Sequence, residues 1–232
     1  MNSIISLNKI SKIFKINRNI KVLNKINFKF QKGKIYSLMG PSGSGKSTLL
    51  NILSLIDKPT QGKIKLQNNE IDFLNSDVND YIRSKNIGII YQEKNLLSDF
   101  TALENVYLAC LALNNDKQDA VLKAKRILSK MGLSNRMYHY PSELSGGEMQ
   151  RIAIARALIN KPKIILADEP TGSLDQKSAK QVFKILYKLK NAERVIIYAT
   201  HNRVFANMAD CKLEMINGNI RSINARSKKS KI

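Results

Sequence analysis

A glycine-rich segment near the beginning of the chain has the composition of a phosphate-binding loop. The segment GPSGSGKS, residues 40–47, matches the pattern GxxxxGK followed by Ser or Thr, between an apolar run and a helical pattern. Glycines let consecutive backbone N–H groups turn toward phosphate oxygens, and the following helix adds its positive end. Lys46 would reach the outer phosphates, and the Ser47 hydroxyl would ligate Mg²⁺. The alternative is a chance glycine turn, which matches this pattern about once in a hundred chains of this length. The predicted nucleotide contacts are Gly40, Pro41, Ser42, Gly43, Ser44, Gly45, Lys46, Ser47 and Thr48.

Two adjacent carboxylates end a second apolar run, IILADE, residues 164–169. Ligands of a parallel sheet bind at the carboxyl ends of its strands, so Asp168 is expected beside the phosphate-binding loop. There it would hold Mg²⁺, directly or through water. Glu169 is then placed to polarise an attacking water, which predicts nucleotide hydrolysis. Taken alone, the pair would equally suit a solvated turn.

Gln92 and His201 also follow apolar runs, IGIIY and VIIYAT. An amide at this sheet edge can orient water or ligate a metal, and an imidazole can contact a terminal phosphate. Gln92 is therefore a candidate Mg²⁺ ligand, and His201 is a candidate catalytic residue. Each alone is also typical of an ordinary polar strand end, and His139 is expected to be structural.

The segment LSGGE, residues 144–148, starts another helical pattern. Ser145 and Glu148 have the spacing of a capping box, and local capping is the simplest interpretation. Capping does not explain Gly146 and Gly147, which weaken a helix and leave its first N–H groups uncovered. An uncovered helix start binds anions. Because residues 40–47 already provide a phosphate site, a second one needs a second explanation.

The elements that position these residues alternate between strands and helices. Such alternation predicts a mostly parallel sheet with helices on both faces. A helical block over about 92–160 interrupts the pattern, and it contains a capping box at Thr101 and Glu104. The expected strands are 4–14, 22–30, 35–39, 86–92, 163–168 and 195–200, with hairpins over 62–74 and 212–222. The expected helices are 48–56, 101–113, 116–133, 176–190 and 202–209.

Composition excludes several classes of protein. The 232 residues are 43% hydrophobic and 25% charged, as in a soluble globular protein. No apolar run is long enough to span a membrane, and the first residues lack a signal peptide's apolar core, so we expect the chain to stay in the cytoplasm. The net charge of +21 is spread over the chain, and only 226–232 form a basic cluster. No specific nucleic-acid partner is expected, because no aromatic-interleaved basic motif accompanies the charge. The two cysteines are far apart and predict free thiols.

The motifs, taken together and in order, resemble those of ABC transporter ATPases. This resemblance covers nearly the whole chain, from GPSGSGKS through Gln92, LSGGE and IILADE to SLD at 173–175 and His201. It implies ATP and Mg²⁺ as ligands, and two copies packed head to tail. The residues implied to contact the partner's ATP are Ser145, Gly146, Gly147 and Glu148. Asp175 would lie across the interface, and Phe14 matches an adenine-stacking aromatic, with a core or edge Phe as the alternative.

The resemblance also implies the domain organisation. We expect one domain over 1–232, with an ATP-binding core and antiparallel β subdomain at 1–91 and 161–222. The helical subdomain would be 92–160, and a basic tail would follow at 223–232. Its partners would be integral membrane subunits, which place it peripherally on the cytoplasmic side of the inner membrane.

Within the family, the motifs look most like the lipoprotein-releasing subgroup. The alternatives are a macrolide-type or other exporter or importer, and a cell-division complex with a structural ATP-binding role. A soluble translation or repair ATPase would suit the charge, but neither tandem cassettes nor a long coiled coil is present. The residues that depart from the subgroup are Glu93, Lys94, Met149 and Ser173.

Overall fold

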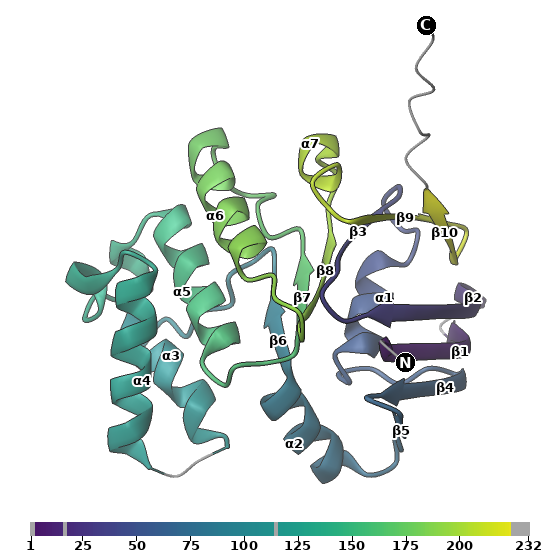
Figure 1. Ribbon diagram of the computed structural model, residues 1–232, viewed down its shortest axis with the longest axis horizontal. Coiled ribbons are helices and arrows are strands. Elements are labelled where there is room, and N and C mark those ends of the chain that lie inside the picture. The colour runs from purple at the N-terminus through teal and green to yellow at the C-terminus, as the bar shows by residue number, and fades with distance from the viewer. Residues whose placement is uncertain (1–2, 16–17, 114–115, 224–232) are drawn as a thin grey trace, which may run out of the picture.

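The computed structural model describes residues 3–15, 18–113 and 116–223. Within them, a six-stranded sheet has the order β10-β9-β3-β8-β7-β6, and all neighbouring strands are parallel except β9 and β10 (Figure 1). The strands are β3 (Ile35–Met39), β6 (Ile87–Ile90), β7 (Ile164–Asp168), β8 (Val195–Ala199), β9 (Cys211–Ile216) and β10 (Asn219–Ile223). The predicted α/β fold with a mostly parallel sheet is confirmed.

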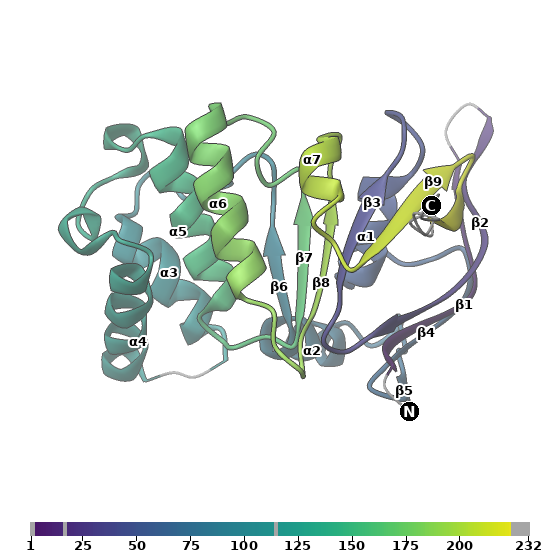
Figure 2. The same ribbon diagram turned by 45° about the horizontal axis from the view of Figure 1, so that its top comes forward.

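Helices cover both faces of this sheet, which explains why its central strands are almost entirely apolar. Successive side chains of a strand point to opposite faces. In β8, Ile197 packs in one buried cluster with Leu49, and Ile196 packs in another with Phe183. The helices on these two faces are α1 (Lys46–Leu53) on one, and α5 (Gly146–Leu158) and α6 (Gln176–Lys188) on the other (Figure 2). The short helix α7 (Arg203–Ala206) follows β8.

A second sheet is antiparallel, in the order β2-β1-β4-β5. Its strands are β1 (Ser3–Lys15), β2 (Asn19–Gln31), β4 (Gln61–Leu66) and β5 (Asn69–Glu70). Its apolar face, including Ile5 and Ile64, belongs to the same buried cluster as Leu49. The backbone N–H of Asn24 donates to the carbonyl of Gly218 at 2.9 Å, which ties β2 to the β9–β10 hairpin. The two sheets therefore share one core.

Three helices, α3 (Ala102–Leu111), α4 (Lys117–Lys130) and α5, form a further buried cluster of their own. The capping box predicted at the start of α3 is present, with Thr101 as N-cap and Glu104 as its partner. This cluster lies inside 92–160, the segment assigned to a helical subdomain, whose boundaries stay a prediction. In the described ranges, no helix is both long enough and apolar enough to cross a bilayer.

Several predicted elements differ from the structure. An unpredicted helix, α2 (Ser76–Asn86), precedes β6, and its one buried residue is Asn79, so it carries little apolar periodicity. The 62–74 hairpin contains only β4 and β5, and β6 ends at Ile90 instead of Gln92. Short 3-10 helices at Ser134–Arg136 and Pro141–Glu143 were not predicted. The basic tail lies outside the described residues, apart from Ile223 at the end of β10.

Candidate nucleotide-binding and hydrolysis site

The loop between β3 and α1 is shaped by two glycines. Gly40 has a φ of 150° and Gly45 a φ of 101°, backbone conformations that other residues rarely adopt. A Cβ atom on Gly40 would lie 2.4 Å from the carbonyl oxygen of Met215, and one on Gly45 would lie 2.9 Å from Leu23 Cδ2. The two ends of the loop therefore lie very close to β9 and β2, and a side chain at either glycine would displace the loop.

The open side of this loop has the properties of an anion site. Helix α1 begins after Gly45 with no side-chain cap and no acidic residue in its first turn. Its first N–H groups and its positive end are therefore not covered by side chains. The buried Lys46 donates through Nζ to the carbonyl oxygens of Gly40 and Pro41, each at 2.9 Å. Among the described residues, the buried hydroxyl of Ser44 has no hydrogen-bond partner. The uncapped start of α1 and the unpaired Ser44 hydroxyl, with the Lys46 ammonium beside them, fit a chain of phosphates.

Replacing Lys46 by Met is expected to weaken ATP binding without unfolding the chain. Methionine keeps most of the aliphatic stem but removes the charge that would contact the phosphates. Hydrogen bonds to charged groups contribute about 1.5–3 kcal/mol, so the Kd for ATP should rise about ten- to hundredfold. Calorimetric titration measures this change, and circular dichroism checks the fold. An unchanged Kd in a folded Lys46→Met variant would exclude Lys46 from the phosphate site.

Neighbouring strands of the central sheet end at one edge and bring the predicted residues together. The order β3-β8-β7-β6 places, side by side, the segments that begin with Gly40, Thr200, Glu169 and Tyr91. Asp168 is the last residue of β7 and pairs with Ala199 of β8. The backbone N–H of Thr200 donates to Leu38 of β3 at 3.2 Å. The two carboxylates and the phosphate-binding loop therefore share the carboxyl edge of the sheet.

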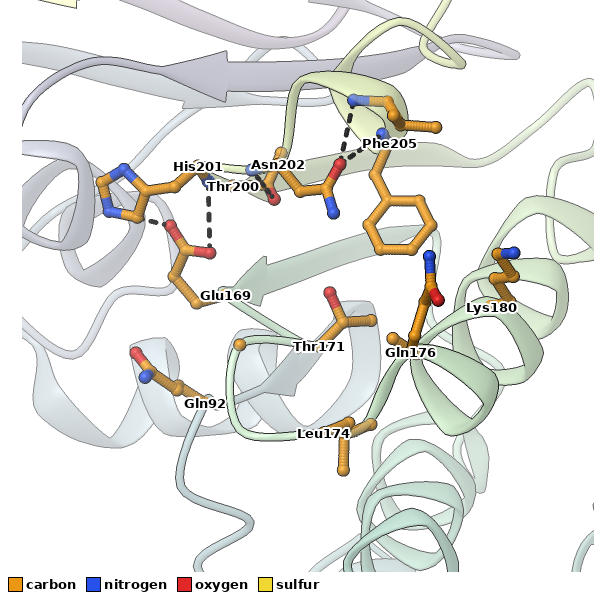
Figure 3. Close-up of a pocket in the computed structure, with 13 residues that line it drawn as sticks. Gln92, Glu169, Thr171, Leu174, Gln176, Lys180, Thr200, His201, Asn202 and Phe205 are labelled. Carbon is orange, nitrogen blue, oxygen red and sulfur yellow. Dashed lines mark hydrogen bonds and ion pairs between the residues drawn. The ribbon is translucent and has the colours of Figure 1, made fainter.

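Glu169 and His201 contact each other at this edge (Figure 3). Oε1 of Glu169 lies 3.2 Å from Nε2 of His201, and Oε2 accepts a 3.3 Å hydrogen bond from the His201 backbone N–H. Oε1 is buried and makes no hydrogen bond of good geometry with any described residue. A carboxylate oxygen with free lone pairs is able to accept a proton from water, which is the chemistry of a general base.

The backbone of Glu169 adopts an unusual conformation. Its φ of 44° lies in the left-handed region, which is uncommon for residues other than glycine. Two backbone hydrogen bonds hold it there, from Glu169 N–H to Ala199 at 3.1 Å and from Gly172 N–H to Glu169 at 3.0 Å. Strained backbone held by its surroundings is concentrated at functional sites. Eight other non-glycine residues of the described chain also have a positive φ, so this conformation explains how the Glu169 side chain is presented and does not by itself mark the site.

Gln92 lies next to Glu169. Both side chains, with that of His201, line a cavity of about 590 Å³ (Figure 3). A Cβ atom on Gly172 would lie 3.4 Å from Gln92 Nε2 and 3.5 Å from Glu169 Cβ. The structure thus brings together three of the predicted residues, although β6 ends two residues before Gln92.

Ser145 caps α5 in the manner that its spacing predicts. Its hydroxyl donates to Glu148 Oε2 at 2.7 Å and accepts from the Glu148 backbone N–H at 3.3 Å. The other carboxylate oxygen, Oε1, accepts from Arg136 Nε at 3.1 Å. Hydrogen bonds from the backbone and hydroxyl of Ser145, followed by the Arg136 contact, lower the pKa of Glu148. The side chain of Ser145 nevertheless stays exposed to solvent.

The glycines that follow Ser145 contact the start of α6. A Cβ atom on Gly147 would lie 3.0 Å from Ser178 Oγ, and one on Gly146 would lie 3.5 Å from Leu174 Cδ2. Asp175 caps α6 by accepting from the backbone N–H groups of Lys177 at 2.9 Å and Ser178 at 3.0 Å. A hydrogen bond from the Ser178 side chain is the main cause that lowers the pKa of Asp175. Gly147 therefore has a structural role within a single chain, because the absence of a side chain lets α5 pack closely on α6.

The signature residues 145–148 do not lie at the phosphate-binding loop of their own chain. Glu148 contacts Arg136, and Gly146 and Gly147 lie close to Leu174 and Ser178. Both views place α5 and α1 on opposite sides of β6, β7 and β8 (Figures 1 and 2). Contact between these residues and a nucleotide at residues 40–48 would therefore need a second copy of the chain.

Phe14 lies on β1, and 37% of the residue is exposed. Nζ of the buried Lys12 lies 4.9 Å from the ring centroid and 2.6 Å from Asp57 Oδ1. The Lys12 ammonium, held by Asp57, therefore makes a cation–π contact with one face of the ring. An exposed ring with a cation on one face is suited to stacking with a base on the other. Stacking of Phe14 on adenine stays a prediction.

Residues that hold the loop after β6 were not predicted. Arg156 of α5 donates from Nη1 to the carbonyl of Asn95 at 2.7 Å and from Nη2 to that of Lys94 at 2.9 Å. Burial lowers the pKa of the Arg156 guanidinium. The Gln150 amide, which is buried, reaches the carbonyl of Tyr91 at 3.4 Å. The only signal in the sequence was the presence of polar residues in an otherwise apolar helix.

A glycine-shaped loop with an open helix start, followed by carboxylates at a neighbouring strand end, defines a P-loop nucleotide-hydrolysing protein. A family model described as ABC transporter matches residues 23–172, and the chain belongs to this family. It is an ATPase subunit of that family, as its loop, carboxylates and LSGGE segment indicate.

Named relatives agree with this assignment. The chain is 46% identical over 211 residues to the lipoprotein-releasing system ATP-binding protein LolD of Rickettsia bellii, covering 90% of this chain and 93% of the relative. It is 47% identical over 214 residues to LolD of Wigglesworthia glossinidia brevipalpis, covering 91% and 93%. A dimeric ATP-binding cassette in a post-hydrolysis state, bound to ADP and Pi, superposes with a TM-score of 0.87 at 35% identity, covering 94% of this chain and 97% of the cassette.

Proposed function

We propose that this chain hydrolyses ATP to drive integral membrane subunits that release lipoproteins from the inner membrane toward the outer membrane. The observation that carries the hydrolytic part is the Glu169 carboxylate, which has a free oxygen beside His201 at the edge that also carries the phosphate-binding loop. The lipoprotein-releasing part is supported by the similarity to LolD proteins over about nine-tenths of the chain.

In the proposed reaction, each side chain acts on the phosphates or the attacking water. Lys46 exchanges its carbonyl partners for phosphate oxygens. Oε1 of Glu169, which lies beside the ring of His201, accepts a proton from the water, while the backbone N–H of His201 holds the other carboxylate oxygen, Oε2. Gln92, which lines the same cavity beside Glu169, orients the water. Phe14 stacks on the adenine.

The predicted Mg²⁺ ligands are hard oxygen donors of the kind this ion prefers: Ser47, Asp168 and Gln92. Ser47 is exposed in the first turn of α1, and Asp168 is half-buried at the end of β7. No three His, Cys, Asp or Glu side chains gather into a metal site in the described parts of the chain. The remaining ligands would therefore be phosphate oxygens and water, a donor set that fits Mg²⁺ bound together with ATP. When bound, the ion would neutralise phosphate charge.

The proposed active unit is a head-to-tail dimer. Ser145 and Gly146 stay partly exposed at the start of α5, away from their own loop, so each ATP would contact residues 40–48 of one copy and 145–148 of the other. Asp175, exposed beside this surface, would face the partner. The similarity to a cassette that was solved as a dimer supports this arrangement.

Purification from membranes is expected to recover this chain with integral membrane subunits, as a peripheral protein on the cytoplasmic side. The complex, reconstituted in vesicles, should release a membrane-anchored lipoprotein only with hydrolysable ATP. A complex that hydrolyses ATP but exports a small molecule and releases no lipoprotein would assign the chain to another transporter. A chain that purifies without membrane subunits would contradict the transport role altogether.

A further inference from the structure

Two loops at the edge of the site are joined by a side-chain hydrogen bond. Nζ of Lys94, in the loop after β6, donates to the hydroxyl of Ser173, in the turn after Glu169, at 2.7 Å. These residues are 79 positions apart in the sequence. Both also depart from the pattern of the subgroup that the sequence resembles. The two departures therefore contact each other.

The loop that carries Lys94 is anchored on its other side. Arg156 donates to the carbonyl oxygens of both Lys94 and Asn95, so the backbone on which the lysine stands is fixed to α5. A lysine side chain loses considerable rotamer freedom when it is held, and a fixed backbone reduces what remains to be ordered. The backbone of Lys94 is therefore already fixed when its side chain donates to Ser173.

The bond lies beside the residues proposed to act on water. Gln92, two positions before Lys94, lies close to Gly172, one position before Ser173: a Cβ atom on that glycine would lie 3.4 Å from Gln92 Nε2. The N–H of Gly172 in turn donates to the carbonyl of Glu169 at 3.0 Å. The loop and the turn therefore meet at two adjacent points, one formed by Gln92 with Gly172 and one by Lys94 with Ser173.

We infer that Lys94 is a positioning residue, whose bond to Ser173 fixes the separation between Gln92 and Glu169. This inference rests on the proposed ATP hydrolysis, because both of those residues act there on the attacking water. Hydrolysis depends on groups held in the productive geometry, so freeing the loop lowers the rate of the chemical step. It affects ATP binding less than the rate, since the phosphate-binding loop lies on other strands and Gln92 is only one of the predicted Mg²⁺ ligands.

The test is a double-mutant cycle with Lys94→Met, Ser173→Ala and both together. Each single variant should lower kcat for ATP hydrolysis about three- to tenfold, the size of one hydrogen bond, with a much smaller change in KM for ATP. The double variant should be no slower than the slower single variant, because the same bond is lost in each. Lys94→Arg, which keeps a donor, should recover part of the loss.

Lys212→Met is the matched control. Lys212 is also half-buried and donates to a neutral side-chain oxygen, that of Asn207, at 2.7 Å. The kcat of the Lys212→Met variant should equal that of the unmodified chain. Additive effects of Lys94→Met and Ser173→Ala, or equal losses in kcat and in 1/KM, would overturn the inference. If the unmodified chain itself does not hydrolyse ATP, the proposed function fails instead.

Discussion

Glu169→Gln is expected to abolish steady-state ATP hydrolysis and to leave ATP binding unchanged. The amide has the size of the carboxylate and occupies the same place beside His201, but it does not accept a proton from water. General-base catalysis contributes about 10²–10⁴ in rate, so kcat should fall by at least about a hundredfold. Phosphate release measures kcat, and calorimetry measures the Kd for ATP.

The same variant should accumulate as a dimer when ATP is present, because a dimer closed around unhydrolysed nucleotide has no step that reopens it. Light scattering with and without ATP measures the mass. Glu193→Gln is the control, since Glu193 is an exposed carboxylate that pairs with Lys32 away from the site. Normal kcat in Glu169→Gln would remove this residue from the chemical step, and a monomer in the presence of ATP would contradict the closed dimer.

The central sheet was predictable because its strands are buried on both faces. Burial on both faces keeps 164–167 and 195–199 apolar, and it leaves 35–39 with one small polar residue, Ser37, whose hydroxyl donates to the carbonyl of Ala206, so the apolar runs mark the strands directly. Helix α2 was not predictable in this way, because only Asn79 of it is buried and no apolar stripe marks it. The α2 segment forms a helix through the Asn75 cap and its contacts with β6 instead.

The residues of the site were predictable where they follow these strands. Asp168, Glu169, Gln92 and His201 could be located because parallel strands end at a common edge. The left-handed conformation of Glu169 leaves no mark in the sequence, since it results from hydrogen bonds with β8 and Gly172. Contacts between distant segments, such as Lys94 with Ser173, depend on how loops pack after the sheet has formed.

Ser145→Ala is expected to have two separate effects. Loss of the N-cap hydroxyl should lower the free energy of unfolding of the nucleotide-free chain by about 1 kcal/mol. Loss of the proposed contact with the partner's ATP should lower kcat by about a hundredfold or more, the cost of removing one preorganised donor to a charged transition state. The Kd of a single chain for ATP should not change, because residues 40–48 are untouched. Denaturant unfolding, phosphate release and calorimetry measure these quantities separately.

Thr101→Ala separates capping from catalysis, because α3 begins with a matching capping box. Its hydroxyl donates to Glu104 at 2.8 Å and accepts from the Glu104 backbone N–H at 3.3 Å, and the equivalent distances at Ser145 are 2.7 and 3.3 Å. In both boxes, hydrogen bonds from the capping residue lower the pKa of the glutamate. The stabilisation that comes from the hydrogen bonds to these carboxylates is therefore fully present above the ordinary pKa of glutamate. In both boxes it is lost as the pH falls through the lowered pKa of the glutamate. The two alanine variants should be destabilised alike at neutral pH, and their difference from the unmodified chain should narrow but not vanish in acid, because the bond from the backbone N–H to the hydroxyl does not need the carboxylate charge. Only Ser145→Ala should lose hydrolysis. Equal losses of kcat in the two variants would reduce Ser145 to a helix cap and remove the main support for a shared site.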